Sequence, residues 1–146
     1  MLSKKTQYSI NALVRLAKYY KKGPLLIKEI AEMENIPKKF LEGILLDLKN
    51  KGILASKRGK GGGYYLRKNP EDINLADIIR HFDGAIALLP CASTNFYESC
   101  EQHHDENTCG VRSVFKEIRD KTANYLRNTT LKDIMDRERE LLKKYY

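Results

Sequence analysis

Apolar residues recur every three or four positions in the first third of the chain, the spacing of one face of an α-helix. A first helix is predicted over about residues 4–20, stopped by the Lys-Lys-Gly-Pro run that ends at Pro24. A short helix is predicted over 27–33, and a third over 37–50, with Pro37 in its first turn where the missing N–H is not needed. The third helix has a continuous apolar stripe, made of Phe40, Leu41, Ile44, Leu45 and Leu48.

Two short β-prone runs follow, over 53–56 and 64–66. The segment 57–63 between them consists of four Gly, two Lys and one Arg. Glycine permits positive φ and a close approach of the backbone to another molecule, so this composition predicts a cationic hairpin tip. Two helices joined by a tight turn and followed by such a hairpin are typical of a winged helix-turn-helix. The alternatives are a helical hairpin that binds nothing and a flexible charged loop.

The second half returns to helical spacing. A helix is predicted over 75–82, closed by Asp83-Gly84, and an apolar segment over 85–90 leads into a polar loop. A long amphipathic helix is predicted from Thr108, and a last one after 128–130. A helix of about 20 residues spans about 30 Å, more than a wing domain needs, so antiparallel pairing across a dimer axis is expected, with burial inside one protomer as the alternative. The apolar positions of the long helix are Val111, Val114, Phe115, Ile118, Thr122, Tyr125 and Leu126, and those of the last helix are Leu131, Ile134, Met135, Leu141 and Leu142.

These elements predict a mainly α fold with a small β-hairpin wing. Three parts are expected: a winged helix-turn-helix DNA-binding domain over 1–68, a connecting helix with a cysteine-containing sensor loop over 69–107, and dimerisation helices over 108–146. The chain has no stretch of 18 or more apolar residues and no apolar signal core near its start, so a cytoplasmic protein without a membrane partner is expected.

The positive charge lies in the first half. Residues 1–70 hold 16 Lys and Arg against 5 Asp and Glu (+11), residues 71–146 hold 11 against 14 (−3), and the two halves sum to the net charge of +8. A solvated Lys-rich face is the ordinary explanation of such an excess. Beside a Gly-rich tip, however, it favours binding of a nucleic acid.

All three cysteines, Cys91, Cys100 and Cys109, lie in the polar loop before the long helix, each separated from the next by eight residues. An odd number of cysteines in a cytoplasmic chain argues against a disulfide framework. Three thiolates from one loop suit an iron–sulfur cluster, while redox-active thiols without metal, a zinc site or no function remain alternatives. An enzyme is not expected, because there is no Gly-rich nucleotide loop and no Ser/His/Asp set, and His81 is best explained as a surface or satisfied core histidine.

The chain resembles the Rrf2 family of winged helix-turn-helix transcription regulators, of the IscR, NsrR and CymR type. The resemblance covers nearly the whole chain. The segments that carry it are Leu2-Ser3-Lys4-Lys5 with Tyr8, Pro37-Lys38-Lys39-Phe40-Leu41-Glu42, Arg58-Gly59-Lys60-Gly61-Gly62-Gly63-Tyr64, Ile73-Asn74-Leu75-Ala76-Asp77-Ile78-Ile79 with Asp83-Gly84, and the three cysteines followed by a long helix.

The resemblance implies a homodimer on a two-fold related, double-stranded DNA operator. Lys38 and Lys39 would contact the DNA backbone or base edges, Glu42 would accept from a cytosine amino group, and Arg58 would enter the minor groove. An acid on an exposed helix face is otherwise ordinarily just solvated. The remaining expected contacts go to phosphates, from Lys4, Lys5, Tyr8 and Lys60, with Gly61 and Gly62 bringing the wing backbone close to the DNA.

The resemblance also implies an iron–sulfur cluster (2Fe–2S or 4Fe–4S) held by Cys91, Cys100 and Cys109. The cysteines are more widely spaced than is usual in the family, Arg112 stands where some relatives have a histidine ligand, and Gln7 stands where others use an acid. The fourth ligand is left open. Its candidates are His103, His104, Glu101, Asp105, Gln7 or a group from the second protomer. The alternative function is a cofactor-free regulator controlled by docking of a partner metabolic enzyme.

Overall fold

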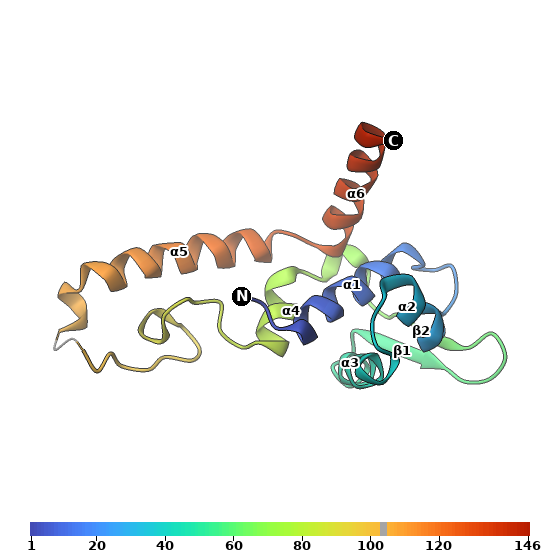
Figure 1. The fold of residues 1–146 in the computed structure, drawn as a ribbon, viewed down its shortest axis with the longest axis horizontal. Helices are drawn as coiled ribbons and strands as arrows, with labels where there is room; N and C mark the ends of the chain where they lie inside the picture. Colours follow the sequence, from blue (N-terminus) through green and yellow to red (C-terminus); the bar gives the residue numbers. More distant parts are fainter. Residues whose placement is uncertain (103–104) are drawn as a thin grey trace.

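The computed structural model describes residues 1–102 and 105–146 (Figure 1). Three short 3₁₀ turns lie at Pro70–Asp72, Pro90–Ala92 and Glu106–Thr108. The predicted mainly α fold with a β-hairpin is confirmed. The helices and strands are α1 (Lys4–Lys18), α2 (Ile27–Glu34), α3 (Lys38–Asn50), β1 (Leu54–Lys57), β2 (Gly63–Leu66), α4 (Leu75–Phe82), α5 (Gly110–Arg127) and α6 (Leu131–Tyr145).

The boundaries of α2, β1 and β2 differ from the sequence prediction by one residue, and those of α1, α3 and α5 differ for reasons that the structure shows. Helix α1 ends two residues earlier than predicted, at Lys18, because the chain turns through a positive φ of 61° at Lys21. Pro37 precedes α3 as its cap instead of occupying the first turn. Helix α5 begins at Gly110, because Cys109 takes the capping position and its Sγ accepts a hydrogen bond from the Arg112 N–H at 3.4 Å.

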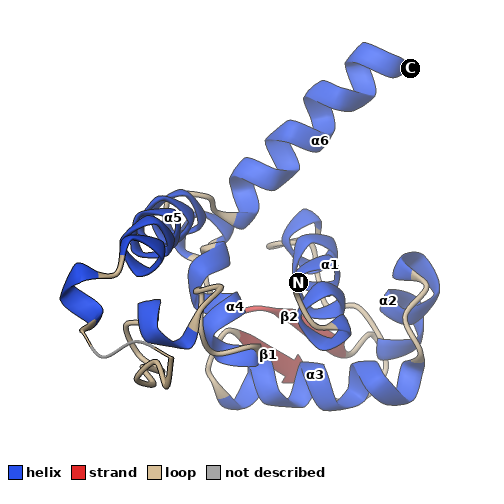
Figure 2. Ribbon diagram, turned by 60° about the vertical axis from the view of Figure 1, so that its left-hand side comes forward, coloured by secondary structure: helices blue, strands red, loops and turns tan. Residues whose placement is uncertain are grey.

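Helices α1, α2 and α3 enclose the core of the winged domain. The apolar stripe of α3 faces α1, so Leu41, Ile44, Leu45 and Leu48 are completely buried. Burying a leucine side chain stabilises a fold by about 1.5–3 kcal/mol, so these four positions hold α3 firmly in place. Figure 2 shows α3 running beneath α1, with the hairpin beside them.

The wing is an antiparallel hairpin in which Leu54 pairs with Leu66 and Lys57 with Gly63. Leu25, just before α2, adds a further bridge: its N–H donates to the Tyr64 carbonyl at 2.9 Å and its carbonyl accepts from the Tyr64 N–H at 2.7 Å. Gly63 has φ +136°, and a Cβ there would lie 2.2 Å from the Leu25 carbonyl oxygen. Only glycine allows the strand to approach this closely.

Helices α4 and α6 pack on α1 from the other side. The Ser3 N–H donates to the Asp83 carboxylate at 3.0 Å, and the Ser3 hydroxyl makes a second, short hydrogen bond to it. Lys18 forms an ion pair with Glu138 of α6. The start of α6 is anchored by a bridge between Asn74 and Thr130. The remainder of α6 projects away from the winged domain (Figures 1 and 2).

Residues 84–102 and 105–127 form an arm that extends away from the wing along the long axis of the molecule (Figure 1). Helix α5 buries only Ala123 among its 18 residues. Its exposed apolar side chains are Val111, Val114, Ile118 and Tyr125. Within residues 1–102 and 105–146, no helix combines the length and apolar character needed to cross a membrane.

Candidate nucleic-acid interface and cysteine cleft

The N-terminal turns of α3 present charged side chains to solvent. Lys38, Lys39 and Glu42 are all exposed, whereas the next turns carry the buried apolar stripe. No side chain caps α3 at Pro37 in the described part of the chain. The first N–H groups of α3 are therefore available to an anion, and the helix dipole adds partial positive charge there.

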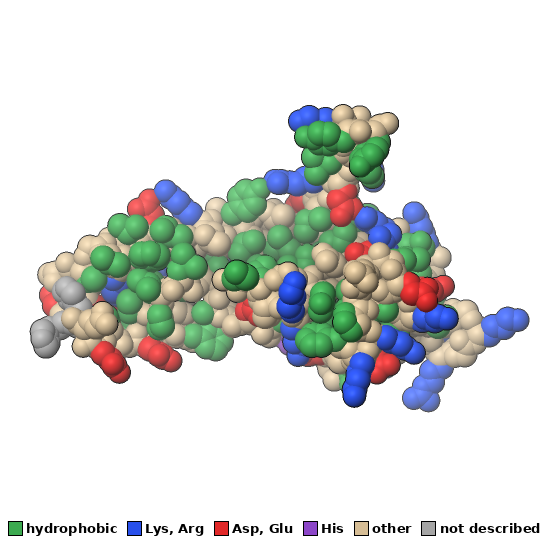
Figure 3. Space-filling view, in the orientation of Figure 1, with side chains coloured by type: hydrophobic (Ala, Val, Ile, Leu, Met, Phe, Trp, Pro, Cys, Tyr) green, Lys and Arg blue, Asp and Glu red, His purple; other side chains and the backbone are tan. Residues whose placement is uncertain are grey.

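Arg58 and Lys60 at the wing tip are exposed. Figure 3 shows Lys and Arg side chains projecting from the end of the molecule that carries the wing. Its turn is closed by the Gly62 N–H, which donates to the Gly59 carbonyl at 3.0 Å. Gly61 adopts a φ of +73°, and a Cβ on the buried Gly62 would lie 2.2 Å from the Lys57 carbonyl oxygen. The glycines therefore hold a tight turn that keeps both cationic side chains pointing outward.

The expected contacts on α1 have other neighbours. Lys4 is exposed. Lys5 lies 3.8 Å from the Asp47 carboxylate and its Nζ is 5.5 Å from the centre of the Phe82 ring. Tyr8 is half-buried, and its ring meets Phe40 edge-to-face at 5.6 Å. Lys5 and Tyr8 therefore join α1 to α3 and α4 as well as bordering the α3 surface.

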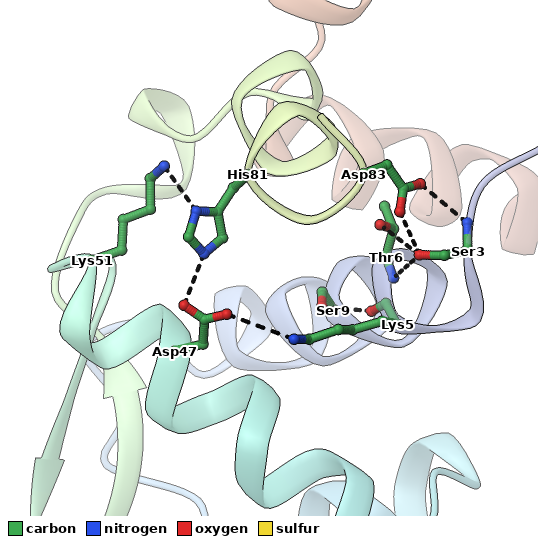
Figure 4. A network of polar contacts seen from close by, with 8 residues as sticks. All are labelled: Ser3, Lys5, Thr6, Ser9, Asp47, Lys51, His81 and Asp83. Carbon is green, nitrogen blue, oxygen red and sulfur yellow. Dashed lines mark hydrogen bonds and ion pairs between the residues drawn. The ribbon is translucent and has the colours of Figure 1, made fainter. Parts of the chain in front are cut away.

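His81 links α4 to α3 (Figure 4). Its Nε2 is 2.9 Å from the Asp47 carboxylate, and its Nδ1 is 3.1 Å from Lys51 Nζ. Since an ammonium group can only donate, Nδ1 accepts and Nε2 carries the proton that is donated to Asp47. The sequence interpretation of His81 as an ordinary satisfied histidine fits this geometry, and its partner, 34 residues away, was not foreseen.

The three cysteines line one cleft of about 500 Å³ at the end of the arm. All three are free thiols; Cys91 is buried and Cys100 and Cys109 are half-buried. Among the side chains that the structure describes, no three His, Cys, Asp or Glu groups stand in metal-binding arrangement. Three sulfur donors on one cleft nevertheless have the chemistry that iron or zinc requires.

The candidates for a fourth ligand are dispersed. Glu101 lines the cleft, whereas Asp105 caps the turn at 106–108 by accepting from the Asn107 N–H at 2.9 Å. Gln7 lies on α1, where its side-chain amide donates to the Leu2 carbonyl at 2.8 Å. His103 and His104 lie outside the described residues.

Glu106 is the main contact of the cleft that sequence reasoning missed. Its carboxylate accepts from the Tyr97 hydroxyl at 2.7 Å and from the Cys100 N–H at 2.8 Å, and lies 3.4 Å from Arg112 Nε. The Tyr97 hydrogen bond, helped by that from Cys100, lowers the pKa of Glu106, and the same bond raises the pKa of Tyr97. The signal available in the sequence was an acid and a base placed three residues before and after Cys109.

Arg112 stands where the family resemblance placed a histidine ligand. In this structure it links separate parts of the loop by hydrogen bonds. Its side-chain Nε donates to the Cys91 carbonyl at 2.9 Å, and its backbone N–H donates to Cys109 Sγ. Together with Glu106, it connects the three cysteine-bearing parts of the loop without itself being a metal ligand.

The model of the Rrf2 family, described as an iron-dependent transcriptional regulator, matches residues 2–137 of this sequence. The chain belongs to the Rrf2 family. A relative in Rhodobacter capsulatus, named as an rrf2-like HTH-type transcriptional regulator, is 41% identical over 138 residues that cover 92% of each chain. The fold and the exposed basic face thus belong to a DNA-binding transcriptional regulator and not to an enzyme, since the Rrf2 relatives are named as regulators.

Two solved structures of Rrf2 regulators resemble the chain throughout. One is CymR, the global cysteine regulator of B. subtilis, with 33% identity and a TM-score of 0.77 over 92% of this chain and 95% of that one. The other is IscR of T. potens, with 27% identity and a TM-score of 0.77 over 100% and 96%. The similarity therefore includes the arm as well as the winged domain.

Proposed function

We propose that this Rrf2 regulator binds a two-fold related operator as a homodimer, and that its DNA affinity is regulated at the cysteine cleft. The single observation that carries the regulatory half is that Cys91, Cys100 and Cys109 line one cleft, although eight residues separate each cysteine from the next. Thiolates are the ligands that iron–sulfur clusters use, so three cysteines on one cleft support a cluster there.

The dimer is proposed from the apolar face of α5. Val111, Val114, Ile118 and Tyr125 recur at helical spacing, and each is between 39% and 61% exposed in the single chain. An apolar stripe of this length on a solvent-facing helix is stable when a second copy covers it. Antiparallel pairing of two α5 helices would place the same stripe on both sides of the interface, as a two-fold axis demands.

We assign the DNA contacts to exposed side chains of the winged domain. Lys38, Lys39 and Glu42 would face the major groove, and Arg58 the minor groove. With about 4 phosphate contacts per protomer, the logarithm of the binding constant should fall against the logarithm of salt concentration with a slope of about 7 for the dimer. The phosphate contacts are assigned to Lys4, Lys5, Tyr8 and Lys60, with the Gly61 and Gly62 amides beside them.

At the cleft, Cys91, Cys100 and Cys109 would hold the cluster, either 2Fe–2S or 4Fe–4S, as thiolates. A bound cluster would supply a centre whose presence or oxidation state reports on iron or oxidants. The residues of this chain would set its surroundings: Glu106 and Arg112 position the two half-buried cysteines, and Glu101, which lines the same cleft, would offer an oxygen ligand for a fourth position.

The route from the cleft to the DNA is proposed to run through α4. The arm leaves α4 at Gly84, where an added Cβ would lie 3.2 Å from the Phe96 ring of the cysteine loop. Just before this point, Asp83 is hydrogen-bonded to Ser3, the cap of α1, and His81 to Asp47 of α3 (Figure 4). A loop that moves Phe96 would therefore shift the balance between two placements of the winged domains.

The test is anaerobic purification with iron and sulfide analysis and a visible spectrum, followed by DNA binding with and without the reconstituted cluster. Cys100→Ser should lose iron and visible absorbance, whereas its neighbour substitution Ser99→Ala should retain both. Equal DNA affinity of the loaded and cluster-free dimers would contradict regulation at the cleft. Asp47→Asn should reduce the difference between these two affinities if α4 carries the coupling.

A second candidate function is a cofactor-free regulator controlled by a docked partner protein. The observation that favours it is a set of exposed apolar side chains in the cysteine loop and just before it. Leu88, Phe96 and Tyr97 are 68%, 56% and 51% exposed. A colourless, iron-free protein that binds DNA, and whose DNA affinity changes when a partner enzyme is added, would favour this function.

A further inference from the structure

A second cleft, of about 560 Å³, lies between α4, the first part of the arm and α5. It is distinct from the cysteine cleft, with which it shares no lining residue. Gly84, Ala85, Ala87 and Ala123 contribute only small side chains to its wall, which leaves space for a small molecule. Figure 2 shows α4 and α5 as neighbours on this side of the molecule.

The charge of this cleft is strongly positive. Arg80 of α4 and both Arg119 and Arg127 of α5 line it, and Asp120 is the one acidic lining residue, so the lining carries +3 − 1 = +2. The cysteine cleft has the opposite character, since Glu98, Glu101 and Glu106 line it with only Arg112. The two clefts therefore select ligands of different charge.

The three guanidinium groups are not equivalent. Arg119 is held by the protein: it donates to the Asp120 carboxylate at 2.8 and 2.6 Å and to the Ala92 carbonyl at 2.6 Å. Over residues 1–102 and 105–146, the side chains of Arg80 and Arg127 make no hydrogen bond or ion pair. Arg119 thus fixes the cleft wall, while the other two guanidinium groups have donors to offer.

Uncharged donors complete the lining. Ser93 is buried, and its Oγ accepts from the Phe96 N–H at 3.0 Å, which leaves the hydroxyl proton for another acceptor. Thr94, Asn95 and Asn124 add hydroxyl and amide groups. Guanidinium groups bind carboxylates and phosphates through pairs of parallel hydrogen bonds, and hydroxyl and amide donors satisfy the remaining oxygens.

We propose that this cleft binds a small multivalent oxyanion, a phosphate-bearing or polycarboxylate compound, with Arg80 and Arg127 as its charged ligands. The site is independent of the cluster and of the DNA contacts. Its occupant would touch α4 and α5 at once, and it would lie next to the Arg119 bond to Ala92, the residue that follows Cys91.

The experiment is titration calorimetry of the cluster-free full chain with inorganic phosphate and, separately, with citrate, at constant ionic strength set with sodium chloride. Saturable binding of either anion supports the proposal, and the tighter of the two identifies the chemical source. Arg127→Gln should weaken binding roughly tenfold, the loss expected for one charge-assisted pair. Arg80→Gln should weaken it comparably.

Lys121→Gln is the matched control. Lys121 is exposed on the same helix, pairs with Glu117 at 2.8 Å and lies outside the cleft, so the variant removes one positive charge elsewhere. Unchanged affinity in this variant is expected. Equal weakening in Lys121→Gln and Arg127→Gln would overturn the proposal, because it would indicate diffuse attraction. Absence of binding, with Arg127→Gln instead weakening the dimer, would overturn it in favour of an acidic side chain from a second copy.

Discussion

The winged half and the arm differ in where their stability comes from. In the winged half, α1 and α3 bury complete leucine and isoleucine side chains, whereas the described residues between 84 and 127 contain only Cys91, Ala92, Ser93 and Ala123 as buried residues. A segment that buries so little apolar surface cannot offset the entropy of ordering its chain. We therefore infer that the winged half folds on its own core, while the arm depends on partners for its order.

The largest expected effect is on the core of the winged half. Leu45→Ala should lower the free energy of unfolding by about 2–5 kcal/mol, because Leu45 is fully buried and its truncation leaves a cavity. The neighbouring Leu46 is 52% exposed, so Leu46→Ala should change the free energy of unfolding by less than about 0.5 kcal/mol. Denaturant unfolding measures both. Equal losses would mean that α3 does not bury the face assigned to it.

Substitutions in the arm should change the dimer dissociation constant instead of the free energy of unfolding. Val114→Glu places a charge in the apolar stripe of α5 on both copies, and should raise the dimer dissociation constant about a hundredfold, or about 3 kcal/mol. Ser113→Glu adds the same charge one residue away, outside the stripe, and should leave dimerisation unchanged. Sedimentation measures both constants. A dimer that tolerates Val114→Glu would place the interface elsewhere.

At the wing, Arg58→Ala should weaken DNA binding by about 1–3 kcal/mol and relax the preference for a narrow, A·T-rich minor groove. Lys60→Ala should weaken binding to all sequences alike and reduce the salt slope by about 1 per protomer, because each wing then neutralises one phosphate fewer. Lys116→Ala on the arm removes the same charge far from the wing, and serves as the control in fluorescence titrations. Equal effects of all three would contradict the assignment of recognition to the wing.

The smallest effect concerns the contact between α1 and α4. Ser3 caps α1, and its loss in Ser3→Ala should cost about 0.5–2 kcal/mol. Burial alone would raise the pKa of Asp83, but the hydrogen bonds from Ser3 outweigh it and lower the pKa below the ordinary 3.8. The contribution of Asp83 to stability is thus present above pH 3.8 and is lost as the pH falls through the lower folded-state value.

Asp83→Asn checks this sign. Its unfolding free energy should be lower than that of the natural chain near neutral pH, and the difference should shrink as the pH falls below 3.8. Glu32→Gln removes a charge from an exposed site on α2 and should show no such convergence. A difference that grows on acidification would mean that the Asp83 pKa is raised.

Local patterns predicted the winged half well, because periodicity, caps and glycines are properties of neighbouring residues. The Gly-rich tip and four of the five predicted stripe positions of α3 lie where the sequence placed them. The prediction was wrong for Phe40, which is 46% exposed and packs edge-to-face on Tyr8 at the border of the core. The bridge between Leu25 and Tyr64, the bond between His81 and Asp47 and the contact between Ser3 and Asp83 join residues 34 to 80 positions apart, which no local pattern encodes. The same reason kept Glu106 and Arg112 out of the predicted site, since their roles depend on how the loop closes.

The short bridge between Asn74 and Thr130 gives the arm a mechanical role. The Leu75 N–H donates to the Thr129 carbonyl and the Leu131 N–H to the Ile73 carbonyl, both at 3.0 Å, so the start of α4 and the end of the segment after α5 are joined at one point, which can act as a fulcrum for α4 and the arm. With 18 residues, α5 is about 27 Å long, and a rotation of about 10° at the fulcrum would sweep its far end through about 5 Å. Cys109 lies at that far end. Helix α5 would therefore act as a lever, in which a small rotation beside the winged domain becomes a large displacement at the cysteine cleft.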